Sequence, residues 1–135
     1  MNWKKFAVAF VGVLVVSNVG GFVVHGWLLQ GDYAQFPNLL RTQEDANAHF
    51  LFTLLNFVFY SLGFVWIYAH GVENKPWVGQ GLRFGAAVWL MTSVAFFLTY
   101  YAVQPWPGYL VAKQIGYELV VRLAEGLTAA ALYKR

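Results

Sequence analysis

Ionisable side chains stand inside the last hydrophobic segment of this 135-residue chain, where such groups are rare. Glu118, Arg122 and Glu125 lie well within that segment, and Gln114 precedes them by one helical turn. On a helix of about 3.6 residues per turn, these four side chains fall within about 80° of one another. Charge in a hydrocarbon environment is costly unless it is paired or hydrated, so it marks a functional site or a specific helix contact. We therefore take these four residues as candidate ligand-binding or transport residues.

The same spacing allows a purely structural interpretation. Arg122 follows Glu118 by four residues and precedes Glu125 by three, and both separations suit ion pairs on one helix. A self-neutralising network that only holds helices together is therefore a second hypothesis for these charges.

The first hydrophobic segment adds Asn18 and His25, which share one helical face with Gly21. We include Asn18 and His25 among the candidate binding residues. A metal or haem site could be assembled from His25, His49 and Glu118, but the two histidines stand on separate segments without the HxxxH or HxxE spacing of metal sites. We predict no metal site, with His25 and His49 as the nearest candidates, and no residue pattern identifies a cofactor.

Composition defines the class of protein that must position these groups. Hydrophobic residues make up 59% of the chain and charged residues 11%, against about 25% charged residues in soluble domains. A small soluble domain could not hide so much apolar surface, so we predict an integral membrane protein. The chain has no cysteine, which excludes thiol chemistry and disulfides. The formal charge of +3 comes from scattered residues without a basic stripe, so no nucleic-acid partner is expected.

Four segments are long enough to cross a bilayer, which takes about 20 mostly apolar residues. Their approximate bounds are residues 6–29, 48–70, 80–103 and 109–133. Short connections between them predict one all-α domain, an up-down-up-down four-helix bundle. Positive charge sets the orientation, and the basic residues outside the segments gather on one side. That side holds Lys4, Lys5, Lys75, Arg83, Lys134 and Arg135, against Arg41 on the other, so both termini are expected in the cytoplasm.

Small residues recur at a spacing typical of close helix packing. Gly81 and Gly85 form one small-xxx-small pair, and Gly126 with Ala130 forms another in the last segment. Such residues let membrane helices approach closely, so we expect Gly81, Gly85 and Gly126 to serve packing.

Several short motifs occur together along most of the chain: NW near the start, HGWLL at the end of the first segment, GLRFG, and YELV–x4–EGL–x4–LY at the end. In this pattern the chain resembles uncharacterised small four-span bacterial membrane proteins. The resemblance implies a topology and a bacterial cytoplasmic (inner) membrane location, and it brings no established activity.

Three functions fit these observations. The first is an oligomeric channel or transporter for an ion or small solute, with a polar path along the fourth helix that forms between protomers. The second is an accessory or assembly subunit of a larger membrane complex. The third is a membrane enzyme that acts on a lipid or isoprenoid, which the lack of a catalytic constellation makes the least favoured. The expected partners are the lipid bilayer and either further copies of the chain or another membrane protein.

Overall fold

A computed structural model describes residues 1–134, and Arg135, counted among the basic residues above, lies outside the described residues. The chain is 84% helical and the described part contains no strand, which confirms the predicted all-α class. The α-helices are α1 (Trp3–Gly21), α2 (Gln30–Tyr33), α3 (Gln43–Ala48), α4 (Phe50–Gly71), α5 (Trp77–Trp89), α6 (Ala95–Val103) and α7 (Gly108–Leu132). Two π-helical segments, η1 (Phe22–Leu28) and η3 (Leu90–Val94), and one 3₁₀ turn, η2 (Pro37–Leu39), complete the structure.

Three continuous helical rods are long and apolar enough to cross a membrane. They are Trp3–Leu28, Phe50–Gly71 and Trp77–Val103, of 26, 22 and 27 residues. Helix α7 has a similar length, 25 residues, but carries Lys113, Glu118, Arg122 and Glu125. Length alone would let α7 span a bilayer, and its charges require partners inside the protein.

Local sequence explains where the long helices begin and end. The side chain of Asn2 caps α1 by accepting a hydrogen bond from the backbone N–H of Lys5 at 3.0 Å. Pro76 and Pro107 directly precede α5 and α7, where a missing N–H costs nothing. Gln104 is extended at the end of α6, as expected for a residue before a proline.

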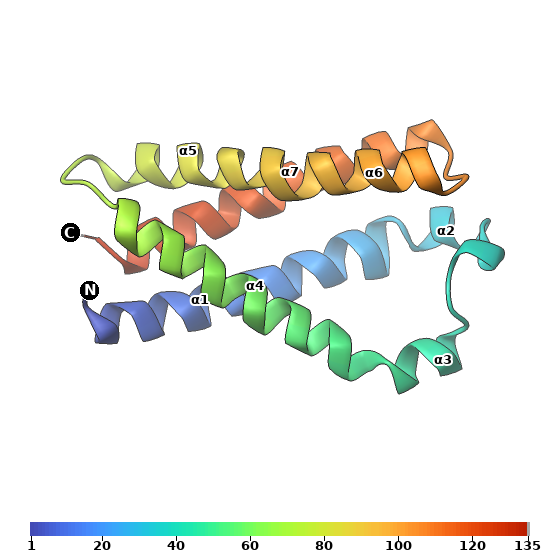
Figure 1. Ribbon diagram of the computed structural model, residues 1–135, viewed down its shortest axis with the longest axis horizontal. Helices are drawn as coiled ribbons and strands as arrows, with labels where there is room; N and C mark the ends of the chain where they lie inside the picture. Colours follow the sequence, from blue (N-terminus) through green and yellow to red (C-terminus); the bar gives the residue numbers. More distant parts are fainter. Residues whose placement is uncertain (135) are drawn as a thin grey trace.

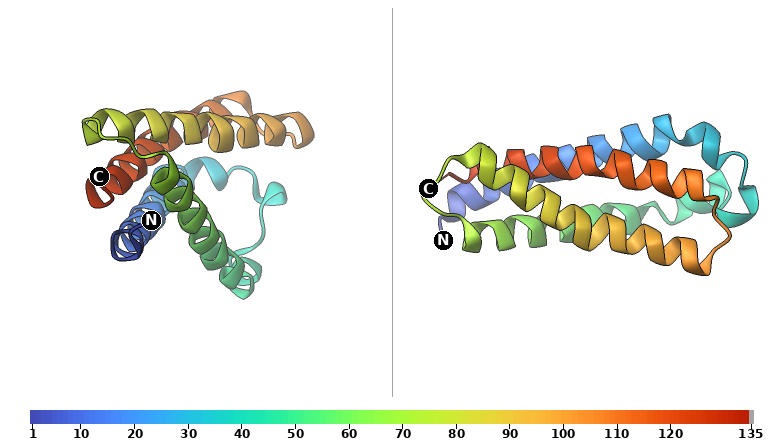
Figure 2. Two further views of the ribbon diagram at one scale, coloured as in Figure 1. Left: turned by 60° about the vertical axis from the view of Figure 1, so that its left-hand side comes forward. Right: turned by 90° about the horizontal axis from the view of Figure 1, so that it is seen from above.

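The helices pack around α7, and both termini lie at one end of the molecule (Figures 1 and 2). Helices α5 and α6 form one rod through η3 that lies along α7, and α1 packs on α7 as well. Helix α4 contacts α1 but diverges from α6 away from the termini, so the bundle is open on that side (Figure 1).

Two apolar clusters fill the ends of the bundle. The first, at the end with the termini, includes Phe6, Val13, Phe64, Val65 and Ala129. The second, at the far end, is formed by Val24, Leu29, Trp106, Leu110, Val111 and Val121. Buried polar side chains lie between the two clusters, so the middle of the bundle is the place where a polar site is held.

Glycines set the distance between α5 and α7. A Cβ atom at Gly81 would lie 2.7 Å from the carbonyl oxygen of Gly126, and one at Gly85 would overlap the carbonyl oxygen of Arg122. A Cβ at Gly126 would in turn overlap the carbonyl oxygen of Gly81. The two backbones therefore touch, and this contact fixes the part of α7 that carries the charged residues.

Candidate functional site

Arg122 lies between two carboxylates of its own helix. Its Nη2 atom is 2.8 Å from Oε2 of Glu118, and its Nη1 atom is 2.7 Å and 2.9 Å from the two carboxylate oxygens of Glu125. Both ion pairs follow from the spacing of four and three residues along α7. Glu118 and Glu125 are 5% and 0% exposed, so these charges face the interior of the bundle.

The carboxylate of Glu125 is fully satisfied by donors from three helices. Ser17 of α1 donates to Oε1 at 2.7 Å and Tyr60 of α4 donates to Oε2 at 2.7 Å, in addition to the two bonds from Arg122. The Tyr60 ring also lies against the guanidinium group, 4.6 Å from its centroid to the Arg122 Cζ atom. Glu125 therefore joins α1, α4 and α7 and has no capacity left for a ligand.

Glu118 is held differently. Its Oε1 atom is 2.8 Å from Nε2 of His25, which comes from η1. Its Oε2 atom is buried and pairs with Nη2 of Arg122 at 2.8 Å without an aligned hydrogen bond, and the Ser93 hydroxyl lies close to the same carboxylate. The distance identifies an ion pair while the angle excludes a hydrogen bond, and hydrogen bonds weaken steeply when misaligned. Glu118 thus retains an acceptor position that Glu125 lacks.

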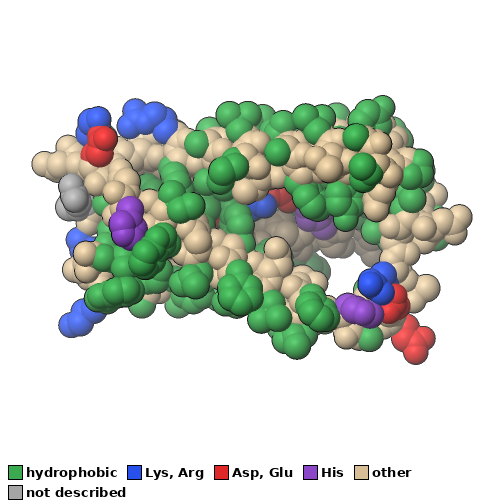
Figure 3. Space-filling model, viewed as in Figure 1, with side chains coloured by type: hydrophobic (Ala, Val, Ile, Leu, Met, Phe, Trp, Pro, Cys, Tyr) green, Lys and Arg blue, Asp and Glu red, His purple; other side chains and the backbone are tan. Residues whose placement is uncertain are grey.

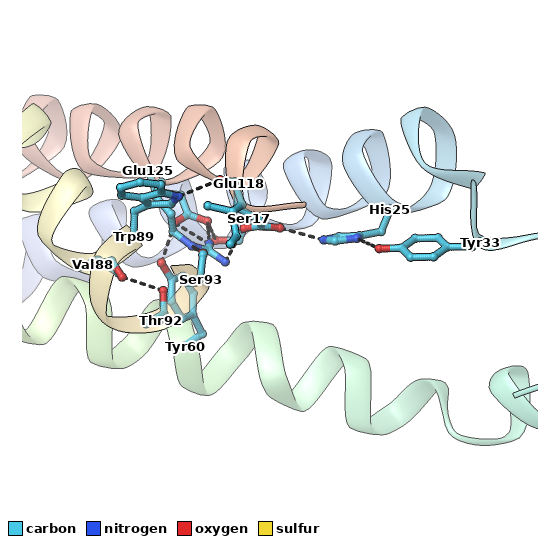
Figure 4. Close-up of polar contacts among 12 residues, drawn as sticks. Ser17, His25, Tyr33, Tyr60, Val88, Trp89, Thr92, Ser93, Glu118 and Glu125 are labelled. Carbon is cyan, nitrogen blue, oxygen red and sulfur yellow. Dashed lines mark hydrogen bonds and ion pairs between the residues drawn. The ribbon is translucent and has the colours of Figure 1, made fainter. Parts of the chain in front are cut away.

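His25 continues the chain of contacts toward the end of the bundle opposite the termini (Figure 4). Its Nδ1 atom is 2.7 Å from the hydroxyl of Tyr33, and that hydroxyl also accepts a hydrogen bond from Gln114 Nε2 at 3.0 Å. Burial raises the pKa of the Tyr33 hydroxyl, and the nearby carboxylates of Glu118 and Asp32 act in the same direction. Tyr33 therefore keeps its proton at neutral pH.

Proton positions follow from these contacts. Since Gln114 donates to the Tyr33 oxygen, the Tyr33 proton is free to point at Nδ1 of His25, which leaves the histidine proton on Nε2, facing Glu118. With His25 neutral and both carboxylates ionised, two negative charges and the one guanidinium leave one negative charge. A second proton on His25 would bring this group of side chains to neutrality.

Both π-helical segments carry residues of the site. Segment η1 bears His25, and its wider turn is closed by a bond from the Leu29 N–H to the Val24 carbonyl, 2.9 Å. Segment η3 bears Ser93, whose hydroxyl accepts a bond from Nε of Arg122 at 3.3 Å. A π turn inserts one residue and rotates the side chains that follow, and such turns are frequent at functional sites.

We call the hydrogen-bonded group as a whole the central network. Its members are Ser17, His25, Tyr33, Tyr60, Ser93, Gln114, Glu118, Arg122 and Glu125. It connects the middle of the bundle, at Glu125, to the segment between α1 and α4, at Tyr33 (Figure 4).

A cavity of about 750 Å³ opens beside the central network, between α4 and α6. Glu118, Arg122, Ser17 and Ser93 form its polar floor. Its walls are largely aromatic, with Phe57, Tyr60, Phe96 and Phe97. Figure 3 shows a hollow at this place, with acidic, basic and histidine atoms visible inside it. Polar groups at the base of an apolar cavity of this size are typical of a site for a small organic molecule.

Not every residue expected at the site belongs to it. The Asn18 side chain bonds to the carbonyl of Leu14 on its own helix. His49 bonds to the backbone of Asp45, so it shares no bonding partner with His25. The described residues contain no cluster of three or more metal-type ligands. Asn18 and His49 are therefore separate from the central network.

Four members of the central network were not among the candidates from the sequence. Ser17 and Ser93 are polar residues in apolar segments, which is a signal, although serine is common in membrane helices. Tyr33 and Tyr60 are two of eight tyrosines in the chain, and nothing in the sequence distinguishes them. Their roles depend on which helix faces lie opposite α7.

No family model matches the chain, and no curated protein or solved structure is similar to it. The resemblance to small four-span bacterial membrane proteins stays a prediction. The chain is all-helical, with three membrane-compatible helices and a buried charged network on α7 beside a cavity.

Proposed function

We propose that the chain is a four-span protein of the bacterial cytoplasmic membrane, with α7 as the fourth span and both termini in the cytoplasm. The charges of α7 fit this role because each is paired or faces other helices rather than lipid. Lys4 and Lys5 in the first turn of α1, Lys75 before α5 and Lys134 after α7 lie at the end with the termini, in line with the positive-inside rule. The cavity then lies in the outer half of the bilayer, with its floor near the middle.

The protein's function in this proposal is the transport of a small solute through the cavity. The observation that carries it is Glu118, which lines a cavity of about 750 Å³ and has one buried carboxylate oxygen that is ion-paired with Arg122 but receives no aligned hydrogen bond. A buried acceptor without an aligned donor is costly, and a solute that supplies the donor removes that cost. The purely structural hypothesis for the charges explains Glu125, which is saturated, but leaves the second oxygen of Glu118 without an aligned hydrogen bond beside a cavity.

A transporter fits the cavity better than an open channel does. The lining extends toward the termini only as far as Ser17, Tyr60 and Arg122, and beyond it the first apolar cluster closes the bundle. A cavity that is closed at one end suits alternating access, in which the site opens first to one side and then to the other. The cavity is lined by residues of one chain, whereas the sequence analysis expected the path to form between protomers. Homo-oligomerisation remains part of the proposal, without being needed to build the site.

Single cysteines can test this proposal directly, because the chain has none of its own. Phe97→Cys places a thiol in the cavity, and Leu98→Cys places one on the exposed outer face of the same helix. With a membrane-impermeant thiol reagent on intact cells, we expect the cysteine at 97 to react and the cysteine at 98 to react far more slowly. Asn38→Cys, in the connection between η1 and α4, serves as the outside reference, and Asn74→Cys, in the connection between α4 and α5, serves as the inside reference.

A third position separates transport from simple binding. Ser93→Cys, at the floor, should react from outside in cells and from inside in inverted vesicles, because alternation exposes the floor to each side. Reaction from one side alone would contradict transport. Equal and slow reaction at 97 and 98 would contradict a cavity that opens to the outside water, and outside reaction at 74 would contradict the proposed orientation.

A further inference from the structure

We propose that the transported solute is an organic monocation, an amine with N–H donors and an aromatic or alkyl body, exchanged for one proton. The inference rests on the proposed function, since it names the solute for the same cavity. Three features of the structure carry it: the net charge of the central network, the position of the free acceptor and the chemistry of the walls.

The central network has a net negative charge that one positive charge would neutralise. Its two carboxylates and one guanidinium leave one negative charge while His25 is neutral. The other nearby cation, Lys113, is engaged with Asp32 at 3.1 Å on the exposed side of α7. An uncompensated charge in an apolar setting is costly, so either a proton or a cationic solute stabilises the site.

The carboxylate that can accept this positive charge is Glu118. Glu125 receives four hydrogen bonds, from Ser17, Tyr60 and twice from Arg122, so it has no room for another donor. Glu118 Oε2 receives none that is aligned, and Glu118 is 5% exposed and lines the cavity. An ammonium N–H directed at this oxygen would form a charge-assisted hydrogen bond, the stronger kind.

The walls favour a cation with an apolar body. Phe57, Phe96 and Phe97 present aromatic rings to the cavity, and ring faces attract cations while their area buries apolar groups. The rings of Phe96 and Phe97 lie 5.5 Å apart in an edge-on arrangement. An anion would add to the negative charge that the central network already carries beside Glu118, and a neutral solute would leave that charge in place.

Proton exchange follows from the contacts of His25. Glu118 of α7 faces Nε2 and Tyr33 of α2 faces Nδ1, while the ring packs near Phe97 of α6. A proton added to the His25–Glu118 pair neutralises the same charge that the ammonium group would neutralise. The two cations therefore compete, so amine binding should release one proton and weaken as the pH falls.

The test uses the full-length chain in detergent and 2-phenylethylamine as the probe, with 2-phenylethanol as its neutral counterpart. Equilibrium dialysis should show amine binding that exceeds alcohol binding by at least about tenfold, the difference expected for one charge-assisted hydrogen bond. Between pH 8 and pH 5 the amine affinity should fall, with a limiting slope of about tenfold per pH unit for one displaced proton. Equal binding of amine and alcohol, or affinity that does not change with pH, would overturn the proposal.

Variants locate the contact. Glu118→Gln keeps the shape of the side chain and removes its charge, so amine binding should fall by about tenfold or more. Glu44→Gln removes an exposed carboxylate outside the cavity and should leave binding unchanged. Unchanged amine binding by Glu118→Gln would contradict the proposal. If Glu118→Gln does not fold, the comparison of amine with alcohol and the pH dependence, both measured on the unsubstituted chain, decide the proposal. Cysteines that react as expected together with no amine binding would reject the solute and leave the transporter proposal standing.

Discussion

Tyr60 of α4 donates its hydroxyl proton to Oε2 of Glu125 on α7 across 2.7 Å. Helix α4 otherwise packs mainly on α1 and diverges from α6, so this bond ties the open side of the bundle to the central network. The ring of Tyr60 also forms one wall of the cavity. One side chain thus both shapes the cavity and fixes the charge at its floor.

Removing only this hydroxyl should therefore lower stability. Tyr60→Phe keeps the ring against Arg122 and deletes the donor to Glu125, and we expect the free energy of unfolding to fall by about 0.5–2 kcal/mol, as for other polar contacts between membrane helices. Denaturation in mixed detergent, followed by circular dichroism, measures it. Tyr101→Phe deletes an exposed hydroxyl and should change stability by less than about 0.5 kcal/mol. Equal values for the two variants would contradict the role of Tyr60.

At the contact between α5 and α7, a glycine-to-alanine substitution should change stability in opposite directions at two positions of α5. Gly79→Ala meets nothing within 4 Å, so it should be neutral or stabilise by up to about 1 kcal/mol through helix propensity. Gly85→Ala places its methyl group against the backbone of Arg122 and should destabilise by about 1–3 kcal/mol, as overpacking does. Unfolding in detergent compares the two. If Gly85→Ala were as stable as Gly79→Ala, α5 and α7 would have to lie farther apart than described.

The pH dependence of stability should report on Tyr33. Because burial raises the pKa of its hydroxyl in the folded state, Tyr33 ionises first in the unfolded chain as the pH rises past about 10. The contribution of the protonated Tyr33 to the free energy of unfolding is therefore fully present below that pH and is lost above it. Tyr33→Phe should make the fall in stability between pH 9 and pH 11 shallower. Parallel curves for the variant and the natural chain would mean that Tyr33 is not buried beside His25.

The sequence predicted the contacts within α7 because they depend on spacing along one helix. The separations Glu118–Arg122 and Arg122–Glu125 imply the two ion pairs, and the structure contains both. The small residues at 81, 85 and 126 likewise mark the contact between α5 and α7, since a close approach of backbones needs them on both helices.

Contacts between helices could not be read in the same way. His25 reaches Glu118 from a π-helical segment, and an inserted residue changes which face of a helix meets its neighbour. Asn18 illustrates the effect: it shares a face with His25 on a regular α-helix, yet in the structure it bonds to its own helix. The cavity itself results from the divergence of α4, which no local pattern encodes.

Arg122 should prove the most sensitive member of the central network. Arg122→Leu leaves Glu118 and Glu125 without a cation, and breaking a buried pair from one side costs about 3–5 kcal/mol. Glu118→Gln should cost less, since its amide oxygen can still accept from His25. Arg83→Leu, an exposed cation on α5, should change stability by less than about 0.5 kcal/mol and controls for the loss of a positive charge.

A second substitution should partly restore the stability that Arg122→Leu removes. Adding Glu125→Gln takes away the fully buried negative charge, while the amide oxygen can still accept from one of the two hydroxyls, Ser17 or Tyr60, and the amide nitrogen can donate to the other. The double variant should therefore be more stable than Arg122→Leu by about 1 kcal/mol or more, within the range of about 0.5–3 kcal/mol for coupled neighbours. Unfolding of the four proteins of this cycle in detergent provides the measurement. If the two substitutions changed the free energy of unfolding additively, Arg122 would not stabilise the charge of Glu125. The ion pair between these two residues would then not belong to the central network.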